Sequence, residues 1–327
     1  MYNIAIVGAT GLVGSTFLKV MEEYNIPVKE LKLFATEMSK GKKIKYLDNE
    51  FIVDTITKGS FSNVDFALFS AGGDASKKYT KQAVDEGAIV IDNSNAWRMN
   101  LDVPLIIPEV NFSAIKDHKL IANPNCSTIQ VVLPLKVLHD HFGIKSINYT
   151  TYQAVSGSGL KGIKDLEKTK DGNPPEFYPY NISKTCIPQI DIFLEDGFTK
   201  EEHKMINETK KILNDDDIKI NATCVRVPIE NCHAVSVQVI LKEKANIDTI
   251  YDLFNNQDGL VVKDDINNAI YPLATEVNNT DEIHIGRIRQ DRINETGILF
   301  YAVADNIRKG AASNAIQIMK ALMVGGR

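Results

Sequence analysis

The stretch NIAIVGATGLVG, residues 3–14, decides how the N-terminal half of this 327-residue chain is expected to fold. It begins with a mostly apolar run, as in a short buried strand, and glycines then recur at every third position. Apolar residues follow helical spacing from Leu12 to Met21, which predicts a helix. A strand that passes through a glycine-rich turn into a helix is typical of the first unit of a parallel, doubly wound sheet.

Gly8, Gly11 and Gly14 are spaced G-x-x-G-x-x-G, whereas the commoner dinucleotide-binding motif is G-x-G-x-x-G. Three glycines are also what a tight strand–helix turn with positive φ requires. Their place after the first strand favours binding, because loop amides and a helix N-terminus together can hold a pyrophosphate. We therefore expect a dinucleotide site at this loop.

The second expected strand, Leu31–Phe34, leads into the segment ATEMSKGKK, residues 35–43. An acidic residue at this strand end favours a free ribose 2′-hydroxyl, whereas basic residues favour a 2′-phosphate. Glu37 and the three lysines that follow it point in opposite directions. These residues leave the choice between NAD and NADP open.

Strands and helices continue to alternate up to residue 94. Residues 64–71 and 88–94 are apolar runs expected as buried strands, and residues 76–87 are expected as a helix that ends at Gly87. This alternation predicts an α/β domain with a Rossmann-type, doubly wound parallel sheet.

The pattern changes after residue 143, where four segments alternate polar and apolar residues like half-buried strands. They are residues 146–159, 220–229, 233–242 and 295–305. Strands of this kind with helices between them predict an α+β second domain with a mixed or antiparallel sheet. The tail, residues 312–326, has the apolar spacing of an amphipathic helix.

Composition excludes several classes of protein. A net charge of −5 and a pI near 5.8 argue against a nucleic-acid partner. No continuous apolar run is long enough to predict a membrane span, and no signal peptide is expected. The four cysteines form no C-x-x-C pair, which favours a reducing, cytoplasmic setting without disulfides.

Cys126 lies at the head of an apolar run, in the segment NPNCST. Asn125 can cap a helix that begins at Cys126, and the helix dipole would then lower the pKa of the thiol. A free cysteine is also commonly a small core residue. On local grounds the nucleophile and the core residue remain equally good interpretations.

Arg226 and His233 lie seven positions apart. On one unbroken strand they would point to opposite faces, but Pro228 predicts a break that lets both reach one pocket. His233 alone would more commonly be a structural hydrogen-bonding residue. Cys224 and Cys232 beside it are a poor zinc signature, so no metal site is expected.

A third polar segment is TKEEHK, residues 199–204. Thr199 and Glu202 form a T-x-x-E capping box, which predicts that a helix starts here. Glu201 and Lys204 are then neighbours on one helix face. Taken alone, they are best interpreted as an ordinary exposed ion pair.

Together these segments resemble the aspartate-β-semialdehyde dehydrogenases almost from end to end. The resemblance rests on GATGLVG, NCSTIQ, TTYQAVSGSG, TKEEHK, INATCVRVPIENCHA and DNIRKGAASNAIQI. The segment from Cys224 to Ala234 is the most specific, because it reproduces the family's C-x-R…[GSC]-H-[STA] signature in order and spacing.

The resemblance implies reversible, NADP(H)-dependent reductive dephosphorylation of β-aspartyl phosphate to aspartate β-semialdehyde, in lysine, threonine and methionine biosynthesis. Cys126 would be the nucleophile that forms a thioester, and His233 would be the general acid–base. No metal takes part in this chemistry.

The resemblance also implies the substrate-binding residues, which are Gln153, Arg226, Glu201, Arg98, Lys204 and Asn125. Arg226 would hold the substrate carboxylate bidentately, as a lysine could not. Arg98 and Lys204 would bind phosphate with help from Asn125, and Glu201 would recognise the amino group.

The cofactor site implied by the resemblance comprises Gly8, Thr10, Gly11, Leu12, Val13, Gly14, Met38, Ser39, Ser156, Gly157 and Asn306. Relatives often carry an arginine where this chain has Met38, and that arginine would contact the 2′-phosphate of NADP. NADP is therefore the implied cofactor, and the missing positive charge makes NAD use an expectation as well.

The resemblance further implies that the C-terminal helix returns to the first domain. Residues 1–125 with 306–327 would bind the dinucleotide, and residues 126–305 would carry catalysis and dimerisation. A homodimer or homotetramer is expected, with a small substrate and phosphate as its other partners.

Two other functions share part of this pattern. An N-acetyl-γ-glutamyl-phosphate reductase would share the cysteine and histidine but not Arg226 together with the Glu201–Lys204 helix, and glyceraldehyde-3-phosphate dehydrogenase does not fit these motifs. A non-catalytic dinucleotide sensor would keep the glycine loop but need not keep Cys126 and His233.

Overall fold

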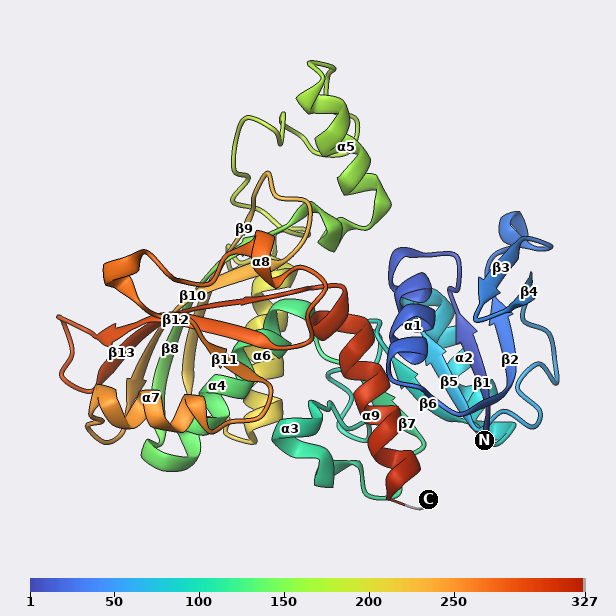
Figure 1. The fold of residues 1–327 in the computed structure, drawn as a ribbon, viewed down its shortest axis with the longest axis horizontal. Coiled ribbons are helices and arrows are strands. Elements are labelled where there is room, and N and C mark those ends of the chain that lie inside the picture. The colour runs from blue at the N-terminus through green and yellow to red at the C-terminus, as the bar shows by residue number, and fades with distance from the viewer. Residues whose placement is uncertain (326–327) are drawn as a thin grey trace. The chain divides into compact units, whose positions relative to one another are not determined.

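The computed structural model describes residues 1–325 and forms two compact units (Figure 1). The first unit comprises Met1–Pro124 and Ala311–Arg327, of which residues 326 and 327, the end of the expected C-terminal helix and domain, lie outside the described part. The second unit comprises Asn125–Gly310. The chain therefore enters the second unit one residue before Cys126.

The first unit is built on a seven-stranded sheet in the order β3-β4-β2-β1-β5-β6-β7. Its strands are β1 (Tyr2–Val7), β2 (Val28–Phe34), β3 (Lys43–Tyr46), β4 (Asn49–Asp54), β5 (Phe66–Phe69), β6 (Ile89–Asp92) and β7 (Leu120–Ala122). The strands from β4 to β7 pair in parallel, which confirms the expected doubly wound sheet. The antiparallel β3–β4 hairpin at its edge was not predicted from the sequence.

Alternate side chains of β1 enter two separate cores, as the two-residue period of a strand requires. Ile4 and Ile6 pack with α1 (Leu12–Glu23) and α9 (Ser313–Val324), whereas Ala5 and Val7 pack in the core that includes Ala83 of α2 (Gly73–Asp85). The central strands are thus covered on both faces. The shorter helices of this unit are η1 (Glu37–Ser39), α3 (Pro108–Asn111) and η2 (Phe112–Ile115).

The second unit contains a six-stranded sheet in the order β11-β12-β13-β10-β8-β9. Its strands are β8 (Ile144–Gln153), β9 (Lys219–Arg226), β10 (His233–Leu241), β11 (Leu260–Val262), β12 (Ile283–Gln290) and β13 (Gly297–Ala304). The central pairs are antiparallel and the two edge pairs are parallel, which confirms a mixed sheet. The register places Gln153 directly opposite Arg226.

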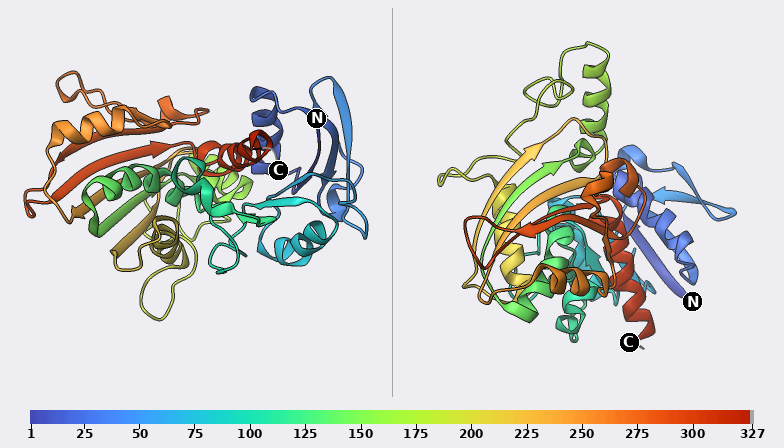
Figure 2. Two further views of the ribbon diagram at one scale, coloured as in Figure 1. Left: turned by 90° about the horizontal axis from the view of Figure 1, so that it is seen from below. Right: turned by 60° about the vertical axis from the view of Figure 1, so that its left-hand side comes forward.

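One face of this sheet is packed against α4 (Cys126–Phe142), α6 (Lys200–Leu213) and α7 (Ile247–Asn255) (Figures 1 and 2). Tyr149 projects towards α6, where its hydroxyl lies 3.1 Å from that of Thr209. The remaining helices of the unit are η3 (Val155–Ser158), α5 (Leu160–Lys170), η4 (Ile266–Asn268), α8 (Ala274–Val277) and the π-helical turn η5 (Arg308–Ala312) that joins the units in sequence.

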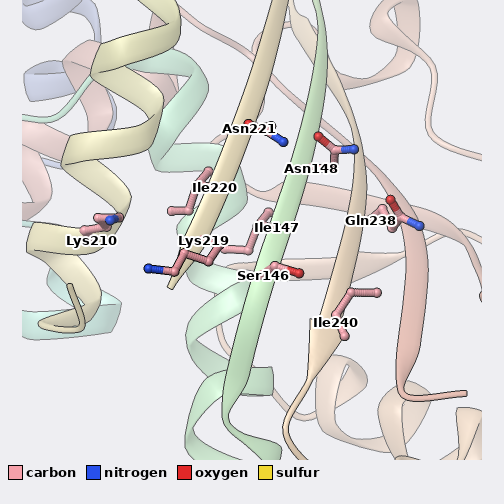
Figure 3. Close-up of a pocket in the computed structure, with 9 residues that line it drawn as sticks. All are labelled: Ser146, Ile147, Asn148, Lys210, Lys219, Ile220, Asn221, Gln238 and Ile240. Atoms are coloured by element: carbon pink, nitrogen blue, oxygen red, sulfur yellow. The ribbon is translucent and has the colours of Figure 1, made fainter. Parts of the chain in front are cut away.

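On the opposite face of the same sheet, several polar side chains are exposed or half-buried, among them Ser146, Asn148, Asn221 and Gln238. Asn148 and Gln238 project from neighbouring strands and line a pocket of about 390 Å³, whose wall also includes Lys219 of β9 and Lys210 of α6 (Figure 3). Tyr152 is likewise exposed. Part of this face is therefore exposed, whereas Ala234 and Val303 pack in a small apolar cluster with Val277 of α8.

Candidate active site

The glycine loop of the first unit is shaped by the lack of side chains. Gly8 has a φ of +90°, and a Cβ there would lie 2.5 Å from the carbonyl oxygen of Ser70. A Cβ at Gly14 would lie 2.1 Å from the carbonyl oxygen of Gly8. Both glycines are therefore required for the turn and for helix–strand packing.

Helix α1 begins after this loop with Gly11 as its N-cap and without a side-chain cap. The loop opens on a pocket of about 450 Å³, whose wall includes Thr10, Thr36, Glu37 and Tyr79. The uncapped N-terminus of α1 and the partly exposed backbone of the glycine loop suit a pyrophosphate. The residues present therefore fit a dinucleotide.

The segment after β2 carries the residues expected to contact the adenosine ribose. Ser39 is buried with its hydroxyl 3.4 Å from that of Thr10, whereas Met38 is 92% exposed. Lys40 forms an ion pair with Asp54 at 3.2 Å. The lysine that follows Met38 most closely in sequence is thus already paired with a carboxylate. Glu37, by contrast, lines the pocket beside the glycine loop.

Arg98 belongs to the first unit and is buried. Its Nε donates to the carbonyl oxygen of Asn123 at 2.9 Å and its Nη2 to that of Asn93 at 2.8 Å. The other five residues expected to bind substrate all lie in the second unit.

Cys126 is the first residue of α4, as the sequence predicts. The Oδ1 atom of Asn125 accepts from the backbone N–H groups of Ser127 at 2.9 Å and Thr128 at 3.2 Å, so the predicted N-cap is confirmed. A Cβ at Gly310 would lie 2.9 Å from the Cβ of Cys126. The partly exposed cysteine is thus held between its cap and the turn at Gly310.

Glu201 joins several of these residues in one hydrogen-bonded cluster. Its Oε1 accepts from the Asn125 side chain at 2.9 Å and from that of Gln153 at 3.3 Å. Its Oε2 lies 2.9 Å from Lys204 Nζ, which also contacts Asp191 at 3.0 Å. The helix start at the Thr199 capping box is confirmed, since this box orients the first turn of α6.

The interpretation of Glu201 and Lys204 as an exposed ion pair was wrong, because Glu201 is only 5% exposed. Its first helical turn packs against α4, a contact between distant segments that local spacing does not reveal. Burial acts to raise the pKa of Glu201, but Lys204, Asn125 and Arg226 outweigh it and hold this pKa below its usual value. Burial likewise acts to lower the pKa of Lys204, but Glu201 and Asp191 raise it to about 12. Both groups are therefore charged at neutral pH.

Arg226 ends β9 and His233 begins β10, so the predicted break between them is confirmed. The peptide of Ala154 contacts both: Arg226 Nη1 donates to its carbonyl oxygen at 2.5 Å, and its N–H donates to His233 Nδ1 at 3.0 Å. A Cβ at Gly157 would lie 2.8 Å from Arg226 Nη1 and 3.0 Å from His233 Nε2. Gly157 therefore keeps the space beside both side chains open.

The hydrogen bond from Ala154 determines how His233 carries its proton. Burial, reinforced by the positive charge of Arg226, lowers the pKa of His233 well below its usual value. The neutral ring accepts at Nδ1, so its proton is on Nε2. This buried Nε2 has no hydrogen-bond partner among residues 1–325, which leaves an N–H donor available to a ligand.

Two residues expected at the cofactor contact each other in the second unit. Asn306 Nδ2 donates to the hydroxyl of Ser156 at 2.9 Å, and Asn306 Oδ1 accepts from the Cys232 N–H at 2.9 Å. These bonds tie η3 to the segment that follows β13.

Sequence reasoning missed three residues of this cluster: Ala154, Asp191 and Glu208. Glu208 Oε2 accepts from the backbone N–H of Asn125 at 2.6 Å. Its spacing of seven residues from Glu201 was a signal, because it places both on one face of the capped helix. Ala154 acts only through its peptide group, which no side-chain pattern reveals.

In the described residues, no three His, Cys, Asp or Glu side chains are grouped as ligands for a metal ion. Between residues 1 and 325, no helix is both long and apolar enough to span a bilayer.

Two protein families match the chain. The one described as semialdehyde dehydrogenase, NAD binding domain, matches residues 3–118. The one described as semialdehyde dehydrogenase, dimerisation domain, matches residues 135–309.

Individual relatives agree with these matches. The aspartate-semialdehyde dehydrogenase of Aquifex aeolicus is 47% identical over 99% of both chains, and that of Legionella pneumophila is 44% identical over 98% of this chain and 95% of its own. The crystal structure of aspartate semialdehyde dehydrogenase II from Vibrio cholerae is 42% identical, with a TM-score of 0.95 over 100% of both chains. A structure of the Vibrio cholerae enzyme complexed with ASA matches with a TM-score of 0.95, at 41% identity over 100% of this chain and 99% of its own.

Proposed function

The chain belongs to the aspartate-semialdehyde dehydrogenase family, and we propose that it reduces β-aspartyl phosphate reversibly to aspartate β-semialdehyde with release of phosphate. The observation that carries this proposal is the cluster around Glu201. Its carboxylate binds Asn125, which precedes Cys126, and Gln153, which precedes the peptide that holds His233 and Arg226. A nucleophile, a proton donor and charged binding groups are thereby connected within one unit.

Substrate binding is assigned to the charged groups of this cluster. Arg226 would hold the substrate carboxylate with its planar guanidinium, and Glu201 would bind the amino group. Lys204 and Arg98 are each proposed to bind phosphate. Asn125 would assist through its remaining amide hydrogen, since Oδ1 serves as the helix cap.

Cys126 begins the chemistry when its thiolate attacks the acyl carbon of β-aspartyl phosphate. The bond from this carbon to the phosphate oxygen breaks, phosphate leaves with the electron pair, and a thioester forms. A bound nicotinamide would supply the hydride that reduces the thioester. The carbon–sulfur bond of the resulting thiohemiacetal anion would then break, which releases the aldehyde and restores the thiolate.

His233 serves as the general acid–base, and its hydrogen bond from Ala154 specifies the nitrogen that acts. The Nε2–H group would donate to the carbonyl oxygen as negative charge develops there. Gly157 supports this role because any side chain at that position would fill the space beside Nε2.

NADP is the cofactor we propose, with NAD accepted as an alternative. Thr10 to Gly14 would hold the pyrophosphate, and Ser39 would contribute near the ribose. Ser156, Gly157 and Asn306 are proposed as further cofactor contacts. Met38 brings no positive charge for a 2′-phosphate, and Lys40 is paired with Asp54. Discrimination between the two cofactors is therefore expected to be weak.

A homodimer through the exposed sheet face of the second unit is the proposed assembly. Asn148 and Gln238 on this face are suited to hydrogen bonds with a second copy (Figure 3). Gln238→Arg should yield monomers in light scattering, whereas Lys45→Glu on β3 should leave the dimer intact. A homotetramer would appear in the wild-type measurement as twice the dimer mass.

We propose the cytoplasm as the location, because a catalytic Cys126 must remain a reduced thiol. Dinucleotide binding is assigned to the first unit, and catalysis with dimerisation to the second.

The central test is a spectrophotometric assay with aspartate semialdehyde, phosphate and either NADP or NAD. Wild-type protein should form reduced nicotinamide, and Cys126→Ala should lose activity by about ten-thousandfold or more. A wild type active only with N-acetyl-γ-glutamyl semialdehyde would favour the rival reductase. Activity retained by Cys126→Ala would exclude the thioester.

A further inference from the structure

Asn125 is held by two carboxylates from the same helix. Glu201 Oε1 accepts from its side-chain amide at 2.9 Å, and Glu208 Oε2 accepts from its backbone N–H at 2.6 Å. The two glutamates are two turns apart on α6, so both face the start of α4. The main chain and the side chain of one residue are thus fixed independently.

Glu208 is 1% exposed, although a carboxylate is normally kept in water. A short, charge-assisted hydrogen bond to the Asn125 N–H offsets part of the desolvation. Lys211 lies on the same helix, where burial lowers its pKa more strongly than the charge of Glu208 raises it. Glu208 has no role among the groups assigned to substrate binding.

The hydrogen bond at Asn125 bears directly on Cys126, the next residue. Asn125 has the extended backbone of an N-cap, with φ −60° and ψ 143°, and any rotation there would turn the first peptide of α4. Gly310 contacts Cys126 closely, since a Cβ on it would come within 2.9 Å. The cysteine therefore has little room to adjust if its cap moves.

We propose that Glu208 is a positioning residue for Cys126. It anchors the backbone of the N-cap, while Glu201 anchors the cap's side chain. Together they fix the orientation of the Cys126 side chain relative to α4. The consequence for turnover rests on the proposed function, but the effect on the cysteine does not.

The test compares Glu208→Gln with Glu208→Met. Both variants are uncharged and similar in size, but only glutamine offers an oxygen to the Asn125 N–H. Cys186→Ser serves as the background, because Cys186 is exposed whereas Cys224 and Cys232 are buried. The rate of iodoacetamide reaction with Cys126 is measured from pH 5 to 10, with kcat and KM.

Glu208→Met should lower kcat by about a hundredfold with KM changed less than about threefold, as expected for a misplaced reacting group. Glu208→Gln should remain within about tenfold of the wild type. The iodoacetamide pH profile of Cys126 should shift in the methionine variant relative to the glutamine variant. Equal impairment of the two variants would assign the effect to charge, and no impairment in either would show that the anchor is unimportant; each result overturns the proposal.

Glu202 provides the matched control. It is also a buried carboxylate of α6, but it accepts from the N–H groups of Thr199 and Cys224 instead. Glu202→Gln and Glu202→Met should lower thermal stability without changing the alkylation profile of Cys126. If the Glu202 pair reproduces the Glu208 pattern, general destabilisation of α6 explains it and the proposal fails.

Thermal unfolding establishes that each variant is folded, and Glu208→Ala replaces Glu208→Met if the latter is not. Alkylation needs neither substrate nor cofactor. Absence of turnover in the wild type would therefore overturn the proposed function, while the alkylation profiles would still decide the role of Glu208.

Discussion

Two helices of this protein begin at positions expected to carry function, and they begin in opposite ways. Helix α1 starts after Gly11 without a side-chain cap, whereas α4 starts after Asn125, whose side chain accepts from two backbone N–H groups. An uncapped N-terminus keeps its N–H groups for a ligand anion. A capped one satisfies them internally, so its dipole acts on a group of the protein, here Cys126.

The difference extends to the surroundings. The turn before α1 depends on backbone shape, since side chains at Gly8 or Gly14 would overlap neighbouring backbone atoms. The start of α4 depends on buried charged side chains, above all Glu201 and Glu208. One site should therefore be sensitive to added volume and the other to lost hydrogen-bond acceptors.

The largest expected effect is that of Gly8→Ala. Its positive φ and the 2.5 Å approach to Ser70 should destabilise the first unit by about 4 kcal/mol and abolish dinucleotide binding. Gly87→Ala is the control, because Gly87 has a φ of +108° but no atom within 4 Å of the position that an added Cβ would take. Urea unfolding should show a distinctly smaller loss for Gly87→Ala; equal losses would assign the effect to φ alone.

Lys204→Met should have the next largest effect. It leaves the buried Glu201 carboxylate without its cation and should cost about 3 kcal/mol of unfolding free energy. The double variant Glu201→Gln with Lys204→Met should recover part of this loss. Chemical denaturation of the single and double variants measures the difference, and a double variant weaker than the single one would contradict the explanation by buried charge.

The pH dependence of stability should identify His233. Because its pKa is lowered in the folded state, its contribution is complete above pH about 6.5 and declines as the pH falls towards the folded value. Below pH 6.5 this loss should approach about 1.4 kcal/mol per pH unit, and His233→Asn should remove it. Denaturation at pH 7.5 and 5.5 measures both slopes.

His284 provides the comparison for that experiment, since burial lowers its pKa as well. His284→Asn should also reduce the slope of unfolding free energy against pH, and its effect should add to that of His233→Asn. An unchanged slope in His233→Asn would show that the ring is not held neutral.

Gly11→Ser would turn the uncapped helix into a capped one. Its extended backbone, with φ −83° and ψ 168°, suits a serine N-cap, although a Cβ would lie 3.3 Å from the Gly8 oxygen. Dinucleotide affinity should fall about tenfold, because the serine competes with the pyrophosphate for N–H groups. Calorimetric titration with NADP measures this affinity. An unchanged affinity would show that the N-terminus of α1 does not bind the pyrophosphate.

Met38→Arg should have the smallest effect. Met38 is 92% exposed, so an added arginine would meet a 2′-phosphate in a solvated setting. NADP affinity should rise about fivefold while NAD affinity stays constant. Met38→Gln is the uncharged control, and an equal gain for both cofactors would argue against phosphate recognition.

Features set by near neighbours in the chain could be predicted from the sequence. The glycine turn before α1, the caps at Asn125 and Thr199, and the break between Arg226 and His233 all follow from short spacings. Each depends on backbone sterics or hydrogen bonds within a few residues, which residue type alone largely determines.

Only the tertiary structure decided which groups are buried together. Glu201 and Lys204 have the spacing of an exposed pair, and nothing in TKEEHK shows that α6 packs against the start of α4. The β3–β4 hairpin also escaped prediction, because its short strands carry no strong apolar alternation. Contacts between residues far apart in sequence depend on how completed elements pack.

By itself the sequence determined three helix starts and a cysteine whose role was open. Only the tertiary structure decided what surrounds Cys126 and its expected partners. It brought Glu208 to the backbone of Asn125, and the Ala154 peptide to His233 and Arg226. The physical reason is that a helix cap is a local hydrogen bond, whereas a buried carboxylate or an oriented imidazole needs partners from other elements.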